Sequence, residues 1–218
     1  MTEAEWLSCN DPVAMLAYLD RPRGNRKLRL FAVACCRDHW QLLPNKASRD
    51  GVDWAERFAD GNAAHDKEYE RLEWACEGAF FYYDYQRSRA SEIADEEGKI
   101  EDLAEAAYFA NTVMCFDQCD PYCPDFHQHR RMLSVNLTHD VFGNPFRPVT
   151  FDPTWRTETA VALSRQMYES RDFSAMPILV DALQDAGCEC DEVLTHCRDP
   201  KGIHVRGCWV VDLVLEKS

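Results

Sequence analysis

The stretch that decides the fold is residues 26–43, RKLRLFAVACCRDHWQLL, in which apolar side chains recur with the period of an α-helix. One side of this helix carries Leu28, Phe31, Cys35 and Leu42. The other side carries Leu30, Val33 and Ala34. Because both sides are apolar, we expect a helix that is buried nearly all round and that ends before Pro44.

The middle of the chain permits long helices, because no proline lies between Pro44 and Pro121. Over residues 64–97, one stripe at helical spacing is formed by Tyr69, Leu72, Cys76, Phe80 and Tyr83. The aromatic run 80–85 also has a high β-propensity, so a strand is the alternative there. The length of the pattern and the charges that flank it favour a helix.

Helical patterns continue along the rest of the chain, and the sequence therefore predicts an all-α protein, an irregular multi-helix bundle. We expect residues 1–142 to form an N-terminal helical bundle with acidic central helices. The proline-rich stretch 143–153 is expected to connect it to a C-terminal helical segment, residues 154–218. This segment is predicted to pack on the bundle as one unit, and a smaller C-terminal helical lobe is the alternative.

Charge and cysteine content narrow the class of protein. The 218 residues include 24 Lys and Arg against 38 Asp and Glu, a net charge of −14, which argues against a general nucleic-acid binder. No apolar run approaches the roughly 20 residues of a membrane helix, and the acidic opening MTEAEWLSC is unlike a secretory signal. Without an export signal, the 11 cysteines are expected to be reduced thiols in the cytoplasm.

The signature motifs of several enzyme classes are missing from the sequence. There is no P-loop, no G-x-G-x-x-G, no G-x-S-x-G, no H-E-x-x-H and no Glu-x-x-His pair. Glu192 and His196 are spaced to share a proton, but the sequence places no nucleophile beside them. The sequence assigns no catalytic residue and no organic cofactor, and it favours a non-enzymatic role.

Two groups of cysteine and histidine have the ligand types of a zinc site. The first follows the spacing C-x3-C-x3-C-x3-H and consists of Cys115, Cys119, Cys123 and His127. The second falls within residues 188–208 and consists of Cys188, Cys190, His204 and Cys208, with His196 and Cys197 between them. For both groups the sequence favours packing over metal binding, because free cysteines commonly fill a core as small apolar side chains.

Negative charge is concentrated in the middle of the chain. Residues 61–120 hold fifteen acidic and five basic side chains. Within them lies an acidic run that consists of Glu92, Asp95, Glu96, Glu97, Glu101 and Asp102. With the aromatic run 80–85, it favours a helical interaction or adaptor module that binds a protein partner through this region. A zinc-binding regulatory or catalytic protein is the alternative, and a solvated acidic face is the simplest explanation of the charge.

Several stretches together resemble a bacterial protein family. They are TEAEWL at 2–7 with RKLRLFAVACCR at 26–37, FGNPFRPV at 142–149, and HVRGCWVVDL at 204–213. The family is expanded into many paralogues in planctomycetes and has no established activity, so the resemblance implies no reaction, cofactor or catalytic residue. Members often carry an alanine-rich middle helix, where this chain has aromatic residues instead. Candidates for a shared site within the similar stretches are Cys35, Cys36, His204 and Cys208.

Overall fold

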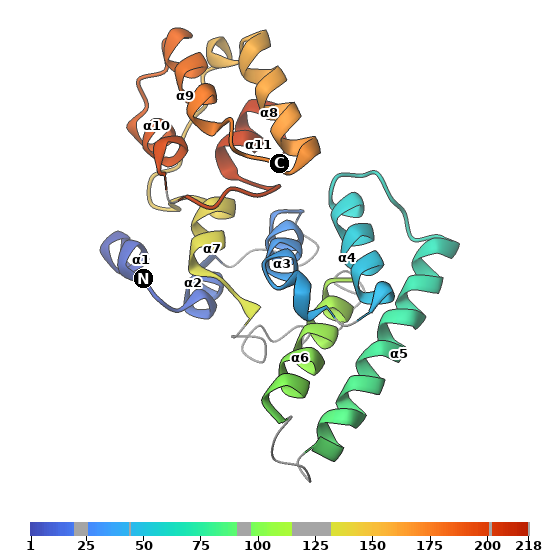
Figure 1. Cartoon of the computed structure of the whole chain (residues 1–218). Helices are drawn as coiled ribbons and strands as arrows, with labels where there is room; N and C mark the ends of the chain where they lie inside the picture. The colour runs from blue at the N-terminus through green and yellow to red at the C-terminus, as the bar shows by residue number, and fades with distance from the viewer. Residues whose placement is uncertain (20–25, 44, 91–96, 115–131, 201, 218) are drawn as a thin grey trace. The chain divides into compact units, whose positions relative to one another are not determined.

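The computed structural model describes residues 1–19, 26–43, 45–90, 97–114, 132–200 and 202–217. Within these ranges every regular element is an α-helix or a short 3-10 helix, and no strand occurs (Figure 1). The prediction of an all-α protein is therefore confirmed. No helix in the described part of the chain combines the length and the apolar character needed to cross a bilayer.

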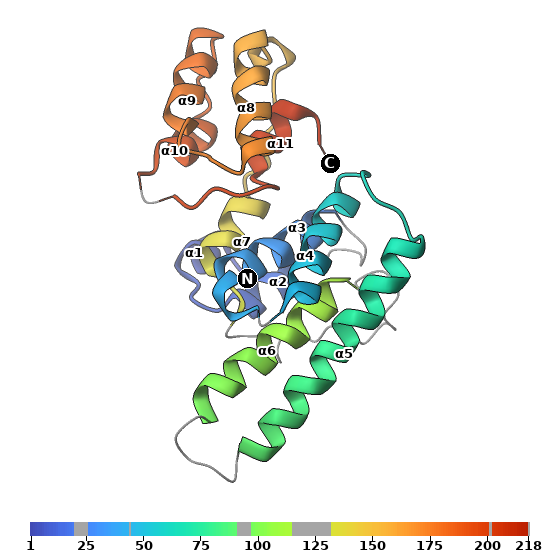
Figure 2. The same cartoon turned by 45° about the vertical axis from the view of Figure 1, so that its right-hand side comes forward.

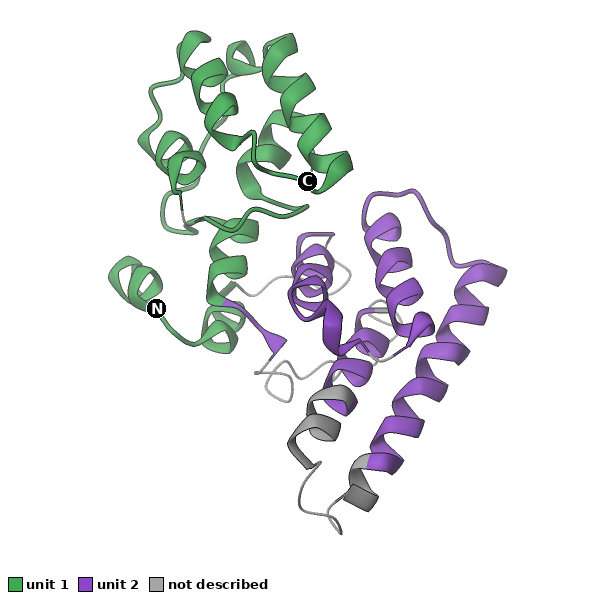
Figure 3. Ribbon diagram, in the orientation of Figure 1, with its two compact units in different colours: residues 1–19, 135–218 green, residues 20–134 purple. Residues whose placement is uncertain are grey.

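The chain divides into two compact units (Figure 3). Unit 1 joins residues 1–19 to residues 135–218, and unit 2 contains residues 20–134. This division differs from the predicted one at 143–153. The N-terminus and residues 135–142 belong with the C-terminal helices, so the proline-rich stretch lies inside a unit instead of connecting two segments.

Unit 2 is built around a buried helix. Its elements are α3 (Arg26–Asp38), η1 (Trp40–Leu42), α4 (Lys46–Ala59), α5 (Lys67–Ala90) and α6 (Glu97–Met114). Residues 29–36 of α3 are all buried, which confirms the burial predicted from the sequence. α5 and α6 run side by side, and α4 packs against both of them and against α3 (Figure 2).

The aromatic run 80–85 lies inside α5, so the helix is confirmed and the strand is excluded. The helix begins at Lys67 because the Asp66 carboxylate caps it, accepting hydrogen bonds from the backbone N–H groups of Glu68 (2.8 Å) and Tyr69 (3.2 Å). Its core side is formed by Tyr69, Leu72, Cys76 and Ala79. The period of 3.6 residues therefore outweighs the local β-propensity of the aromatic rings.

Unit 1 combines two N-terminal helices with the helices of the C-terminal half. Its elements are α1 (Glu3–Ser8), α2 (Pro12–Leu19), α7 (Val135–Phe142), η3 (Pro153–Trp155), α8 (Glu158–Ser170), α9 (Met176–Asp185), α10 (Asp191–Arg198) and α11 (Trp209–Leu215). Its largest core includes Met167, Leu179, Val193 and Val211, which come from α8, α9, α10 and α11. α7 contacts both α2 and α11, and so links the N-terminal helices to this core.

The N-terminus is held to unit 1 by polar and aromatic contacts. The Glu3 carboxylate accepts a hydrogen bond from Asn144 Nδ2 (2.9 Å) and forms an ion pair with Arg147. The fully buried ring of Trp6 packs edge-on against His139, with the ring centroids 5.6 Å apart. These contacts explain why residues 1–19 and the start of the 143–153 stretch lie in one unit.

All the cysteines in the described ranges are free thiols. Burial raises the pKa of the Cys35 and Cys36 thiols in α3, and both side chains are fully buried. Cys35 and Cys36 therefore act as core residues, because a buried neutral thiol is a small apolar side chain.

We expect the Glu56→Gln variant to lower the free energy of unfolding by about 1–3 kcal/mol. The Glu56 carboxylate is 1% exposed and accepts hydrogen bonds from Arg37 Nε (3.2 Å) and Nη2 (2.9 Å). Asp50→Asn is the matched control in the same helix, because Asp50 pairs with Lys46, whose side chain is 85% exposed. Denaturant titration should show a loss below about 0.5 kcal/mol for the control, and equal losses for the two variants would contradict the expectation.

Candidate metal centre

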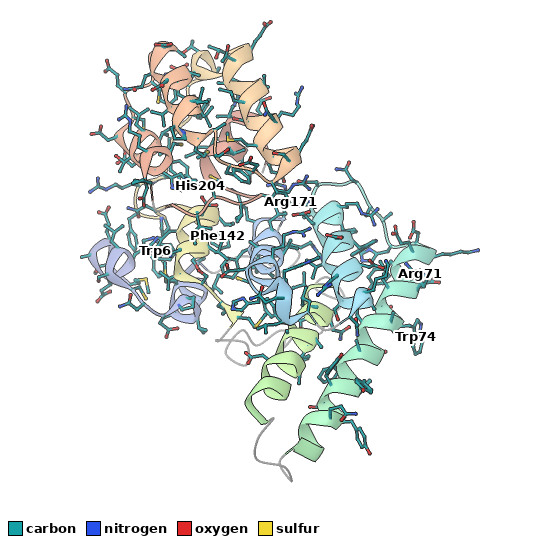
Figure 4. The ribbon with its side chains drawn as sticks, viewed as in Figure 1. Trp6, Arg71, Trp74, Phe142, Arg171 and His204 are labelled. Carbon is teal, nitrogen blue, oxygen red and sulfur yellow. The ribbon has the colours of Figure 1, made fainter. Side chains whose placement is uncertain are left out.

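Four side chains of unit 1 bring ligand-type atoms to one point. They are Asp140, His196, His204 and Cys208, and the four atoms all lie within 4.8 Å of one another. Asp140 comes from α7, His196 from the last turn of α10, and His204 and Cys208 from the segment between α10 and α11. Figure 4 marks the position of His204 near α7. The group therefore joins three separate segments of unit 1.

The distances within the group lie near those of a tetrahedral zinc site without matching them. The Asp140 Oδ1 atom lies 3.1 Å from His196 Nε2 and 2.8 Å from His204 Nδ1. The Cys208 Sγ atom lies 3.3 Å from His196 Nε2 and 3.9 Å from His204 Nδ1. Zinc bonds of about 2.0–2.3 Å at tetrahedral angles separate neighbouring ligand atoms by about 3.3–3.6 Å. For one zinc ion to bind all four atoms, the Asp140–His204 distance would have to lengthen by about half an ångström and the Cys208–His204 distance would have to shorten.

His196 lies close to two other ligand-type atoms at once. Its Nε2 atom is within contact distance of both the Asp140 oxygen and the Cys208 sulfur. An imidazole nitrogen carries at most one hydrogen, so it donates to only one of these atoms at a time. A shared cation satisfies all three atoms at once, because each of them then offers a lone pair.

The Asp140 carboxylate is charged and buried, with 2% of its side chain exposed. Burial raises the pKa of this carboxyl group, but the hydrogen bonds from His196 and His204 outweigh burial and hold the pKa below its ordinary value. The second oxygen, Oδ2, accepts a hydrogen bond from the backbone N–H of Val205 (3.0 Å). The carboxylate is therefore fixed in orientation, with Oδ1 facing the imidazoles.

The Cys208 thiol is protonated in this environment. Burial, followed by the nearby Asp140 carboxylate, raises its pKa well above the ordinary value, and the side chain is fully buried. The thiolate is the form that binds a metal ion, and a coordinated metal ion deprotonates a thiol outright. A cation at this point would therefore reverse the protonation that burial imposes.

A tight turn places His204 and Cys208 side by side. The backbone N–H of Cys208 donates to the carbonyl of Val205 (2.9 Å), and Gly207 between them has a φ of +95°. This is the pattern of a type II turn, whose third residue favours glycine because its φ is positive. The Arg206 guanidinium anchors the turn, since its Nε atom donates to the carbonyl of Tyr168 at the end of α8 (2.6 Å).

The indole ring of Trp209 packs against the His196 imidazole. The two ring centroids are 5.2 Å apart, and the indole also lies against Gly143, which follows α7. A Cβ atom on Gly143 would stand 3.2–3.3 Å from the Trp209 ring, and its φ is +65°. Glycine is required here for both reasons, and it allows α7 to end directly against the tryptophan.

The structure brings together only part of the sets predicted from the sequence. The first group, Cys115, Cys119, Cys123 and His127, lies outside the described residues. Of the second group, His204 and Cys208 belong to the centre. Cys188 is buried in the core of unit 1, and the Cys190 Sγ atom contacts the Glu192 carboxylate at 3.5 Å.

Asp140 is the ligand that sequence reasoning missed. His196 was considered beside the four predicted ligands of the second group and as the partner of Glu192, but not as a ligand itself. Asp140 lies 56 residues before His196 in the chain, so no local spacing connects them. The predicted Glu192–His196 pair is not formed: Glu192 pairs with Arg147 (3.4 Å), and His196 faces Asp140. The spacing of His196, His204 and Cys208 was the only local signal available.

The acidic run proposed for partner binding is not described at the level of side chains. Glu92, Asp95 and Glu96 lie outside the described residues, and so do the side chains of Glu97, Glu101 and Asp102.

Comparison of the chain with protein families, with curated proteins and with solved structures found no match. A function is therefore proposed from the geometry of unit 1.

We expect Gly143→Ala to destabilise the protein more than Gly187→Ala. Both glycines follow a helix and have a positive φ, so each alanine costs about 1–2 kcal/mol in backbone strain. Only at Gly143 does the new methyl group also press on Trp209, whereas nothing lies within 4 Å at Gly187. Overpacking at Gly143 should therefore increase the loss of unfolding free energy by about 1 kcal/mol or more, as measured by denaturant unfolding. Equal losses would show that the Trp209 contact does not constrain the end of α7.

Proposed function

We propose that the protein binds a zinc ion through Asp140, His196, His204 and Cys208. The observation that carries this proposal is the convergence of one carboxylate oxygen, two imidazole nitrogens and one sulfur within 4.8 Å. A mixed set of sulfur, nitrogen and oxygen ligands is typical of zinc. Magnesium and calcium prefer sites made only of oxygen atoms, so the sulfur and the imidazoles argue against them.

The balance of charge supports a divalent cation. Asp140 and the thiolate of Cys208 carry two negative charges, which a zinc ion cancels. A buried group of charges is expensive unless it is compensated, and Asp140 and Cys208 are 2% and 0% exposed. The two neutral imidazoles complete the coordination without adding charge.

Zinc binding at this position also stabilises the fold. The ligands come from α7, from α10 and from the turn before α11, so that one ion links three segments of unit 1. A ligand that binds only the folded state stabilises it by mass action, by about 2.7 kcal/mol at a hundredfold excess over the dissociation constant. We therefore expect removal of zinc by a chelator to lower the thermal stability of the protein.

The variants His204→Ala and Cys208→Ser should each weaken zinc binding roughly 100-fold. A structural zinc site has a binding free energy of about 10–16 kcal/mol, of which one ligand in four contributes about a quarter. Competition with a chromophoric chelator measures the affinity, and elemental analysis measures the stoichiometry.

Cys190→Ser is the matched control for these variants, because its sulfur contacts Glu192 and is not part of the centre. We expect one zinc ion per chain and an unchanged affinity for this control. A protein without stoichiometric zinc after growth in zinc-supplemented medium and after direct titration would contradict the proposal. So would a loss of zinc in Cys190→Ser that equals the loss in Cys208→Ser.

A second candidate function rests on the exposed side of α5. Positions 74, 78, 81 and 85 share one side of the helix, and Trp74, Phe81 and Tyr85 are 74%, 59% and 57% exposed. In Figure 4 Trp74 points away from the helix, as does Arg71 one turn earlier. An unusual run of exposed aromatic rings is typical of a surface that binds a partner, since aromatic side chains dominate interface energetics.

The partner that this surface fits is a basic amphipathic helix of another protein. Acidic side chains lie next to the exposed rings on α5, and they are Glu70, Glu73, Glu77 and Asp84. The whole region 61–120 carries a net charge of −10, which attracts positive charge. We therefore propose that α5, together with the acidic run, makes the protein an adaptor for a basic partner.

A synthetic amphipathic helix of leucine and lysine should bind the protein, and one of leucine and glutamate should not. The triple variant Trp74→Gln, Phe81→Gln, Tyr85→Gln should weaken binding of the basic peptide roughly tenfold or more, measured by fluorescence anisotropy. Ile178→Gln is the control, because Ile178 is 57% exposed on α9 in unit 1. Equal binding by the triple variant and the control would contradict the adaptor function.

A further inference from the structure

A cavity of about 570 Å³ lies beside the metal centre within unit 1. Its lining includes three of the four proposed ligand residues, Asp140, His196 and His204. The fourth, Cys208, does not line it and is fully buried. The centre is therefore asymmetric: the sulfur faces the protein interior, and the carboxylate and imidazoles face the cavity.

This asymmetry distinguishes the centre from a closed structural zinc site. In a closed site four protein ligands surround the ion and leave no approach from outside, whereas an open site keeps a position for water or substrate. A volume of about 570 Å³ is in the range of small-molecule sites, which are clefts of about 300–1,000 Å³. Zinc can expand from four to five ligands, so the side of this centre that faces the cavity has room for one further oxygen atom.

A buried polar atom of one lining residue lacks a hydrogen-bond partner. The His204 side chain is 6% exposed, and its Nε2 atom is buried without a hydrogen bond. His204 offers its other nitrogen, Nδ1, to the centre. In a neutral imidazole whose Nδ1 binds zinc, Nε2 carries a hydrogen and is a donor. A buried donor without an acceptor costs free energy, so this imidazole is not fully satisfied by its protein neighbours.

The remaining lining provides apolar walls and a positive charge. Leu7 of α1 and Ile203 lie on the cavity, and so does the guanidinium-bearing side chain of Arg198 at the end of α10. Arg198 donates to Gln184 Oε1 at 2.5 Å, which uses one of its five N–H groups. The lining also includes Asn136, Thr195 and the acidic Asp199, and such a combination of apolar walls and convergent polar groups is typical of a small-molecule site.

We propose that this cavity binds a small carboxylate or a related oxygen-donor anion, which coordinates the zinc ion directly at an open position. The inference rests on the proposed zinc site and adds its ligand class. The anionic oxygen binds the metal on the side away from Cys208, and Arg198 attracts the negative charge.

The experiment uses the full chain loaded with cobalt in place of zinc and acetohydroxamate as the anionic oxygen-donor probe. Cobalt shows visible absorption bands that depend on the number and type of its ligands. We expect a saturable change of these bands as the probe is added. We also expect Ile203→Trp, which fills the cavity, to weaken binding of the probe roughly tenfold or more. This variant should still bind one cobalt ion per chain.

The matched control is Ile178→Trp, because Ile178 is exposed on α9 and does not line the cavity. It should bind cobalt and the probe as the unchanged chain does. If cobalt binds in a one-to-one ratio and its bands do not respond to the probe, the site is closed and the inference is wrong, while the zinc site stands. If cobalt does not bind at all, the proposed zinc site fails and this inference fails with it.

Discussion

The carboxylate of Asp140 is only 2% exposed inside unit 1, where an uncompensated negative charge would cost several kcal/mol. Three donors compensate it, namely the two imidazoles of His196 and His204 and the backbone N–H of Val205. Each donor lies on a different segment from Asp140 itself. Because the buried charge of Asp140 must be compensated by these donors, it determines how α7, α10 and the turn before α11 come together.

The same arrangement connects the fold of unit 1 to its proposed chemistry. Gly207 allows the turn that brings Cys208 next to His204, and Gly143 allows Trp209 to lie against the end of α7 and beside His196. Arg206 holds the turn to the carbonyl groups at the end of α8. The ligand atoms are therefore held by packed and hydrogen-bonded neighbours, which is the arrangement that a defined metal site requires.

Much of the fold could be predicted from the sequence, because helical periodicity is a local property. The spacing of Leu28, Phe31 and Cys35 gave the buried helix α3, and the stripe from Tyr69 to Cys76 gave the core side of α5. The division into units could not be predicted in the same way. It depends on long-range contacts such as Glu3 with Asn144, whose side chains meet across 141 positions of the chain.

The candidate site was predictable only where its residues are close in the chain. His204 and Cys208 are four residues apart, so the cysteine- and histidine-rich segment 188–208 drew attention to both. Cys188 and Cys190 carry the same chemistry, but the turn after α9 places Cys188 in the core, and Cys190, just before α10, lies beside Glu192. Asp140 had no such signal, since an aspartate next to a histidine on a helix is ordinary until the tertiary structure shows what it faces.

X-ray absorption spectroscopy at the zinc edge of the zinc-loaded protein tests the central claim most directly. The account predicts one sulfur atom at about 2.3 Å and three nitrogen or oxygen atoms at about 2.0–2.2 Å, with outer-shell scattering from two imidazole rings. A shell of nitrogen and oxygen atoms without sulfur would contradict it. A shell with two or more sulfur atoms would also contradict it, because it would place the zinc ion at another group of cysteines.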